Sequence, residues 1–232
     1  MRKQPKRIGL AIIGAGRVGL FRGEVAARHP QVDWIGVADL KPDRAKLVGD
    51  KCKADFVTSD FRELLNRPEV TAAIVSTDEH LHVDPILAAV ERKLSLLIEK
   101  PLATELEASQ RVLEAIKRSG SDAVVGYTQR FRRKWLSVKE KVRTGALGDV
   151  TLVTSRAFMN RLVALDNYKR TNDPKTISPM VISGTHALDV VMWMMEGKQP
   201  VEIYARSVDK ALGPQYKGID ATAGIITFAD GA

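Results

Sequence analysis

Three glycines near the N-terminus have the spacing of a phosphate-binding loop. Gly14, Gly16 and Gly19 follow a short apolar run and open a helical pattern. The first permits a tight turn, the second lets the backbone approach a pyrophosphate, and the third lets the helix pack against the strand. The N–H groups at the helix N-terminus then face the phosphates. We expect this loop, with Arg17 and Val18 inside it, to bind a dinucleotide; the alternative is a glycine turn without a ligand.

An acidic residue further along indicates which dinucleotide would bind. Asp39 stands twenty residues after Gly19, at the end of the next apolar run. A carboxylate at the end of the second strand accepts hydrogen bonds from the adenosine ribose hydroxyls and repels a 2′-phosphate. We therefore expect NAD as the cofactor. Lys41 and Arg44 lie nearby in the sequence and would soften this preference, so NADP remains the alternative.

Lys100 is the candidate acid/base. It lies in the run Glu99-Lys100-Pro101, directly after an apolar strand pattern. In open α/β sheets the carboxyl ends of the strands line the ligand crevice. Beside the positive ring of an oxidised nicotinamide, a lysine would release its proton near neutral pH and could carry out acid/base chemistry. The alternative is a solvated lysine that pairs with Glu99.

The elements that would position these residues alternate along the first half of the chain. Apolar runs predict strands at 8–13, 34–38, 72–76, 94–98 and 123–125. Amphipathic spacing predicts helices at 16–28, 42–51, 61–66, 83–90 and 105–118. Because the strands are apolar on both faces and alternate with helices, we expect an α/β fold with a doubly wound parallel sheet.

The second half has a different pattern. Helices are predicted at 134–143 and 185–195, and longer strands at 150–159, 201–207 and 223–228. Long strands with few helices between them favour an antiparallel or mixed sheet. We therefore place a domain boundary near Tyr127, with residues 1–127 binding the dinucleotide and 128–232 binding the substrate. The last strand reaches Ala232 with no returning strand, so we expect a C-terminally truncated sequence.

Composition narrows the partner classes. The chain of 232 residues is 44% hydrophobic and 28% charged, and no apolar run reaches the ~20 residues of a membrane span. The net charge of +8 favours an anionic small molecule over nucleic acid, because the cluster from Arg130 to Lys134 lacks any DNA-binding motif. The single cysteine, Cys52, suits a reducing cytoplasm. We expect no metal, membrane or nucleic-acid partner.

Four motifs, taken in order, resemble the family of glucose–fructose oxidoreductase, inositol dehydrogenase and MocA. They are the glycine loop, the segment from Ser76 to His82, Glu99-Lys100-Pro101, and the segment from Gly184 to Asp189. Asp78 stands where the family usually has proline. The resemblance covers the whole chain. It implies a Rossmann domain followed by an α/β domain with a mostly antiparallel sheet, and hydride transfer between a nicotinamide and a sugar, polyol or related ring alcohol.

The resemblance also implies site residues. Lys100 would be the acid/base and His186 the second catalytic group, which we expect to act as a neutral hydrogen-bond partner of the substrate. The cofactor pocket would include Thr77, His82, Glu99 and Lys100. The substrate would meet Lys100, His186, Tyr127, Arg161 and Tyr168, the last two from a polar loop at 160–175. For Asp189 a role in the site and a role at the helix N-terminus both stay open. We expect a homo-oligomer joined through the sheet of the second domain.

One departure from the family pattern opens a second interpretation. Many sugar and inositol dehydrogenases of this family carry aspartate four residues before the histidine, where this chain has Ile182. An aliphatic side chain neither accepts a proton nor binds a hydroxyl. Either His186 works with Lys100 alone, another group substitutes, or the substrate lacks the corresponding hydroxyl. The alternative function is a catalytically weak, dinucleotide-binding sensor or regulator, which turnover of a panel of polyols would distinguish from an enzyme.

Overall fold

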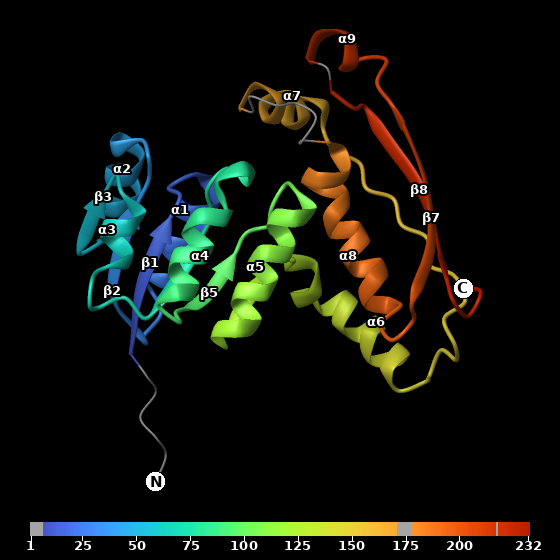
Figure 1. The fold of residues 1–232 in the computed structure, drawn as a ribbon, viewed down its shortest axis with the longest axis horizontal. Helices are drawn as coiled ribbons and strands as arrows, with labels where there is room; N and C mark the ends of the chain where they lie inside the picture. The colour runs from blue at the N-terminus through green and yellow to red at the C-terminus, as the bar shows by residue number, and fades with distance from the viewer. Residues whose placement is uncertain (1–6, 171–177, 217) are drawn as a thin grey trace. The chain divides into compact units, whose positions relative to one another are not determined.

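Two compact units make up the chain. The computed structural model describes residues 7–170, 178–216 and 218–232 (Figure 1). Contacts between Cα atoms divide it into Met1–Gly126 and Tyr127–Ala232. Within the described residues, no helix has the length and apolar character needed to cross a membrane.

The first unit is built on a six-stranded parallel sheet. Its strand order is β3-β2-β1-β4-β5-β6, so the direction of winding reverses between β1 and β4. In such sheets the crevice at the reversal, beyond the carboxyl ends of the strands, is the usual ligand site. The strands are β1 (Ile8–Ile13), β2 (Val32–Ala38), β3 (Phe56–Thr58), β4 (Ala72–Val75), β5 (Ser95–Ile98) and β6 (Ala123–Val125).

Helices cover both faces of this sheet, as Figure 1 shows. Pro42 occupies the first turn of the helix over residues 42–52, where its missing N–H is tolerated. Gly120 adopts the left-handed conformation and ends the helix over residues 106–119. The helices are α1 (Arg17–Ala26), α2 (Pro42–Cys52), α3 (Phe61–Leu65), the 3-10 helix η1 (Glu79–Leu81), α4 (Val83–Glu91) and α5 (Leu106–Ser119).

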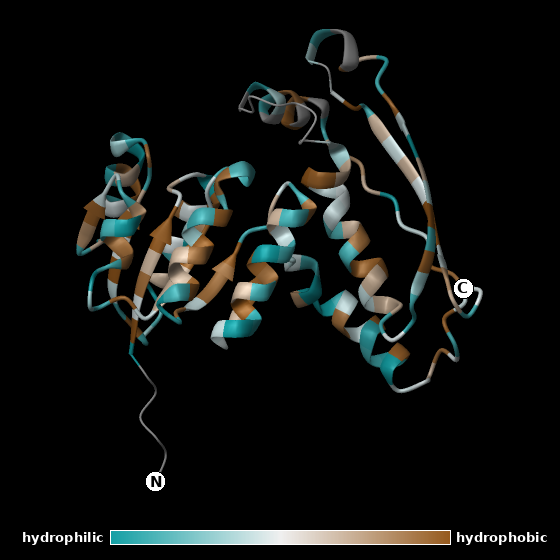
Figure 2. Cartoon of the chain, in the orientation of Figure 1, coloured by the Kyte–Doolittle hydropathy of each residue, from teal (hydrophilic) through white to brown (hydrophobic). Residues whose placement is uncertain are grey.

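Alternation along β1 explains the two apolar layers. Leu10 and Ile12 join the cluster under α1 and α2, whereas Ala11 and Ile13 join the cluster under α3, α4 and α5. Successive side chains of a strand point to opposite faces, so a strand buried on both faces must be apolar throughout. Figure 2 shows this as hydrophobic colour along the strands of the first unit. The parallel, doubly wound sheet predicted from sequence is confirmed.

The second unit combines helices with a small antiparallel sheet. β7 (Pro200–Val208) and β8 (Ala221–Phe228) pair with each other, and every residue of β7 is exposed. The helical elements are η2 (Thr128–Phe131), α6 (Arg133–Arg143), α7 (Arg161–Arg170), the π-helix η4 (Met180–Gly184), α8 (Thr185–Met194) and α9 (Gly213–Tyr216).

Two predicted segments of the second unit differ from the structure. The strand predicted at 150–159 is wrong: residues 151–159 have no regular secondary structure, and β7 and β8 form a two-stranded sheet without them. An apolar pattern alone makes no strand, because the ladder hydrogen bonds must come from a neighbouring strand. The polar loop predicted at 160–175 contains α7, and its last residues lie outside the described part of the chain.

Candidate functional site

The glycine loop between β1 and α1 has the geometry that its spacing predicts. Gly14 has φ +96°, and a Cβ there would lie 2.5 Å from the carbonyl carbon of Ser76. A Cβ on Gly19 would collide with the carbonyl oxygen of Gly14. A Cβ on Gly16, by contrast, would meet nothing within 4 Å. The outer two glycines are thus required by the fold, and the middle one leaves space beside the N-terminus of α1.

Asp39 holds this loop from the end of β2. Its Oδ2 accepts a hydrogen bond from the backbone N of Ala15 (2.7 Å), and its Oδ1 accepts one from the backbone N of Lys41 (2.8 Å). A carboxylate offers about four acceptor positions, so a ribose hydroxyl can still bind. Asp39 therefore shapes the loop itself, a role that sequence spacing did not indicate.

A cavity of about 310 Å³ lies beside the loop. It brings together four of the residues predicted to bind the cofactor: Gly14, Gly16, Asp39 and Thr77. Lys41 and Arg44, expected to soften the choice between NAD and NADP, also line it. Other lining residues were not predicted to bind the cofactor. Ser76, His80 and Leu81 belong to the motif that ends at His82, whereas Phe61 and Pro85 belong to none of the four motifs. With open space at a helix N-terminus, a carboxylate and an apolar wall, these residues fit a dinucleotide.

The remaining residues predicted to bind the cofactor do not line this cavity: Arg17, Val18, Gly19, His82, Glu99 and Lys100. His82 is buried, with 1% of the residue exposed. Its Nδ1 lies 2.7 Å from the carbonyl oxygen of Pro101, and its Nε2 lies 3.2 Å from that of Thr77. The imidazole therefore joins the segment after β4 to the segment that follows Lys100.

Lys100 follows β5, and its neighbours are firmly held. The peptide bond between Lys100 and Pro101 is cis. The backbone N of Glu99 donates to the carbonyl oxygen of Val75 (2.8 Å), which continues the pairing of β4 and β5. The Glu99 carboxylate forms an ion pair with Arg22 of α1, and these side chains are 13% and 14% exposed. From the sequence, we expected Glu99 to contact the cofactor or Lys100, and the role of Arg22 as its partner was not predicted.

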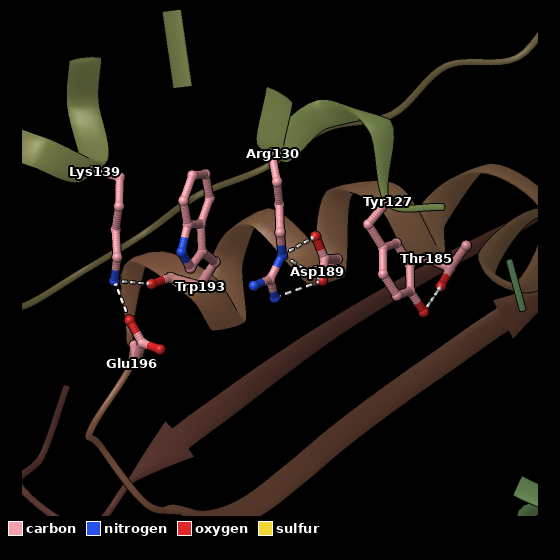
Figure 3. Close-up of polar contacts among 7 residues, drawn as sticks. All are labelled: Tyr127, Arg130, Lys139, Thr185, Asp189, Trp193 and Glu196. Atoms are coloured by element: carbon pink, nitrogen blue, oxygen red, sulfur yellow. Dashed lines mark hydrogen bonds and ion pairs between the residues drawn. The ribbon is translucent and has the colours of Figure 1, made fainter. Parts of the chain in front are cut away.

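In the second unit, Tyr127 and His186 come together. The Tyr127 hydroxyl lies 3.3 Å from Oγ1 of Thr185, the first residue of α8 (Figure 3). The rings of Tyr127 and His186 meet edge to face, with centroids 6.2 Å apart and an interplanar angle of 88°. Two residues predicted to bind substrate are therefore neighbours at the start of α8.

Hydrogen bonds and ion pairs connect α8 and the residues that follow it to η2 and α6. Arg130 donates to both carboxylate oxygens of Asp189 (2.7–3.1 Å), and this hydrogen bonding raises the pKa of Arg130 above its ordinary value. Its guanidinium lies over the ring of Trp193, 5.3 Å from the centroid. Lys139 donates to the carbonyl oxygen of Trp193 (2.6 Å) and pairs with Glu196 (2.7 Å), as Figure 3 shows. Asp189, whose role the sequence left open, is thus the ion-pair partner of Arg130.

Ile182 and Tyr168 belong to an apolar cluster. The Tyr168 side chain is buried with Leu212, and Ile182 packs against them from η4. The Tyr168 hydroxyl donates to the carbonyl oxygen of Ile219 (3.1 Å) and accepts from the backbone N of the same residue (2.9 Å), while burial raises its pKa. These are contacts of a packing residue, so a substrate-binding role for Tyr168 stays a prediction. The side chain of Arg161, which begins α7, lies outside the described residues.

No cluster of three or more histidine, cysteine, aspartate or glutamate side chains suited to a metal occurs among the described residues.

Comparison with family models places both units. Residues 8–127 match the model described as an oxidoreductase family with an NAD-binding Rossmann fold. Residues 135–232 match a C-terminal domain of the GFO/IDH/MocA family. Together the two matches span most of the chain, and they agree with the resemblance stated from the four motifs.

Curated relatives are similar over most of this chain. An uncharacterized oxidoreductase, YrbE, of Bacillus subtilis is 27% identical over 98% of the chain, and an inositol 2-dehydrogenase of Acidothermus cellulolyticus is 33% identical over 82%. The aligned regions are 65% and 53% of the lengths of these relatives. The chain thus spans less than two thirds of either protein.

Solved structures share the fold. The apo scyllo-inositol dehydrogenase of Lactobacillus casei has a TM-score of 0.86 at 18% identity, covering 99% of this chain and 67% of that one. The same enzyme with bound NAD(H) and scyllo-inositol has a TM-score of 0.82 at 18% identity, covering 97% and 67%. The two family matches show that the chain belongs to the GFO/IDH/MocA family of oxidoreductases.

Proposed function

We propose that this protein is an NAD-dependent dehydrogenase that oxidises an inositol-like polyol or a related sugar at a CH–OH group. The observation that carries this proposal is the cavity that brings together Gly14, Gly16, Asp39 and Thr77 at the carboxyl ends of the parallel strands. Membership of the family and the inositol dehydrogenases among its relatives support the substrate class.

The dinucleotide would be held by the first domain, for which we keep the proposed bounds 1–127. The N-terminus of α1 would receive the pyrophosphate, and Asp39 would bind the adenosine ribose. Lys41 and Arg44 also line the cavity, so the discrimination against NADP should be moderate. When bound, NAD accepts the hydride that leaves the alcohol carbon.

The proton chemistry falls to residues of this chain. Lys100 would take the proton from the reacting hydroxyl as the carbonyl forms, and would return it in the reverse direction. His186 would hydrogen-bond the substrate as a neutral imidazole, with the edge-to-face contact of Tyr127 limiting the orientation of its ring. Residues 128–232 would supply the remaining substrate contacts, Arg161 and Tyr168 among them.

Steady-state turnover with a panel of substrates tests this proposal. We expect NADH to form from NAD with scyllo-inositol, myo-inositol or another cyclic polyol, and NADPH to form more slowly from NADP. Binding of NADH without turnover of any polyol or sugar would instead favour the second candidate, a dinucleotide-binding sensor or regulator. Ile182 favours that candidate, because it packs in an apolar cluster and supplies no carboxylate beside His186.

Two further expectations belong to this proposal. We propose a homo-oligomer joined through the sheet of the second domain, supported by the exposed Val201, Ile203 and Val208 of β7. Light scattering would test it, and a monomer at working concentration would contradict it.

A reducing compartment such as the cytoplasm is supported by Cys52, a buried free thiol.

A further inference from the structure

A nearly buried ion pair joins the helix of the glycine loop to the segment of Lys100. Arg22 lies in the second turn of α1, and Glu99 follows the last residue of β5. Their side chains are 14% and 13% exposed. Withdrawing two charges from water is unfavourable unless each compensates the other closely. Loss of Arg22 would therefore leave Glu99 as an uncompensated carboxylate in a mostly buried position.

The glycine at the end of the next strand fits closely against this pair. A Cβ on Gly126 would lie 2.8 Å from Nη2 of Arg22 and 3.2 Å from Oε1 of Glu99. The backbone N of Gly126 also donates to the carbonyl oxygen of Ile98 (2.7 Å). The pair is therefore enclosed by α1 and by the carboxyl ends of β5 and β6, and it has little freedom to rearrange.

The same carboxylate reaches the backbone of Lys100. Oε1 of Glu99 faces Arg22, and Oε2 accepts a hydrogen bond from the backbone N of Lys100 (3.3 Å). On the other side of Lys100, the carbonyl oxygen of Pro101 contacts the buried His82. The backbone of Lys100 is thus anchored before and after the residue, once through Glu99 and once through His82.

The anchor through Glu99 leads back to the dinucleotide loop. α1 begins directly after Gly16, and Oγ of Ser76 donates to the carbonyl oxygen of Gly14 in the same loop (2.9 Å). A helix is stiff over two turns, so a residue in its second turn transmits the position of its N-terminus. Arg22 therefore links the place where a pyrophosphate would bind to the backbone that carries Lys100.

We propose that Arg22 is a positioning residue: through Glu99 it fixes the backbone of Lys100 relative to α1 and the dinucleotide loop. This inference rests on the proposed function, in which Lys100 carries the proton. Arg22 needs no contact with the substrate for this role. Its removal should impair the proton-transfer step while leaving the dinucleotide cavity, whose lining does not include Arg22, able to bind.

Three variants test the role of Arg22. Arg22→Met removes the charge, and Arg22→Lys keeps it. Arg28→Met is a matched control, because Arg28 is exposed and its Nε donates to the nearby backbone oxygen of Glu24. We expect Arg22→Met to lower kcat with NAD and scyllo-inositol by about 10- to 100-fold, the size of effect produced by small misplacements. The Kd for NADH should change less than about threefold. Arg22→Lys should recover most of the kcat, and Arg28→Met should match the parent protein.

Hydrogen exchange supplies a readout that does not depend on activity. In Arg22→Met, the amide of Lys100 should exchange about tenfold faster than in Arg28→Met, because its acceptor is no longer fixed. A folded Arg22→Met with kcat within twofold of the parent overturns the proposal, as does a fall in NADH affinity equal to the fall in kcat. Unchanged exchange at Lys100 also overturns it. If the parent turns over no polyol but the exchange responds as expected, the positioning role stands and the proposed function fails.

Discussion

Two arginine–carboxylate pairs, one in each unit, hold the segments that carry the proposed catalytic residues Lys100 and His186. The two pairs differ in their exposure to solvent. In the first unit, Arg22 and Glu99 are 14% and 13% exposed beside the backbone of Lys100. In the second, Arg130 is 40% exposed while its partner Asp189, on the helix of His186, is 8% exposed. Water can replace a partner only where it reaches the charge. The first pair should therefore tolerate the loss of its carboxylate less well than the second, because the arginine left behind is more buried.

The largest effect is expected at the residue that the first pair anchors. Lys100→Met should reduce turnover by ~10²–10⁴, the usual contribution of a positioned acid/base. NADH affinity should barely change, since Lys100 does not line the dinucleotide cavity. Steady-state kinetics and fluorescence titration of NADH measure the two quantities. Full activity on a proven substrate would remove Lys100 from the mechanism.

Stability measurements test the difference in burial directly. Glu99→Gln should lower the free energy of unfolding by about 3 kcal/mol, the low end for a broken buried pair, because the Arg22 side chain left behind is 14% exposed. Asp189→Asn should cost about 1 kcal/mol, because the Arg130 side chain left behind is 40% exposed and solvent reaches its guanidinium. Urea unfolding of both variants gives the comparison. A larger loss in Asp189→Asn than in Glu99→Gln would show that exposure does not rank the two pairs.

A smaller effect is expected at Asp39, which lies beside the dinucleotide cavity of the first unit. Asp39→Ala removes a charge that repels a 2′-phosphate, so the affinity for NADP relative to NAD should rise by about tenfold. It also removes the acceptor of the Ala15 N–H, so the absolute affinity for both cofactors should fall. Titration with both reduced cofactors gives the ratio. An unchanged ratio would mean that Asp39 serves the loop alone and does not contact the ribose.

The smallest effect concerns the free thiol of α2. Burial raises the pKa of Cys52, and the charge of Glu24 raises it further. Less thiolate is therefore present in the folded protein than in the unfolded chain at the same pH, and alkylation should be slow near neutrality. The rate should increase as the pH rises toward the raised pKa, and also on addition of denaturant. Fast alkylation of the folded protein at neutral pH would show that Cys52 is accessible.

Local patterns predicted the first unit well, because its signals are short in sequence. Continuous apolar runs indicate strands buried on both faces, and the glycine loop and Asp39 lie within one βαβ unit. The two ion pairs were not predicted. Arg22 and Glu99 are 77 residues apart, and Arg130 and Asp189 are 59 apart, so only the fold brings each pair together.

The failed strand at 150–159 has a related cause. Its apolar residues match a strand pattern, but a strand also needs a partner, and residues 151–159 do not join the ladder of β7 and β8. The polar segment after it formed α7, which a search for apolar periodicity passes over. In both cases the deciding interactions are tertiary, and spacing along the sequence does not contain them.

Deuterium transfer tests directly whether a hydride passes from an alcohol carbon to NAD on this protein. scyllo-Inositol deuterated at its ring carbons would be incubated with NAD and the protein, and the reduced cofactor would be analysed by mass spectrometry. We expect one deuterium in each NADH formed and a slower reaction than with the unlabelled compound. Reduced cofactor without deuterium, or NADH binding with no reduction by any polyol or sugar tested, would contradict it.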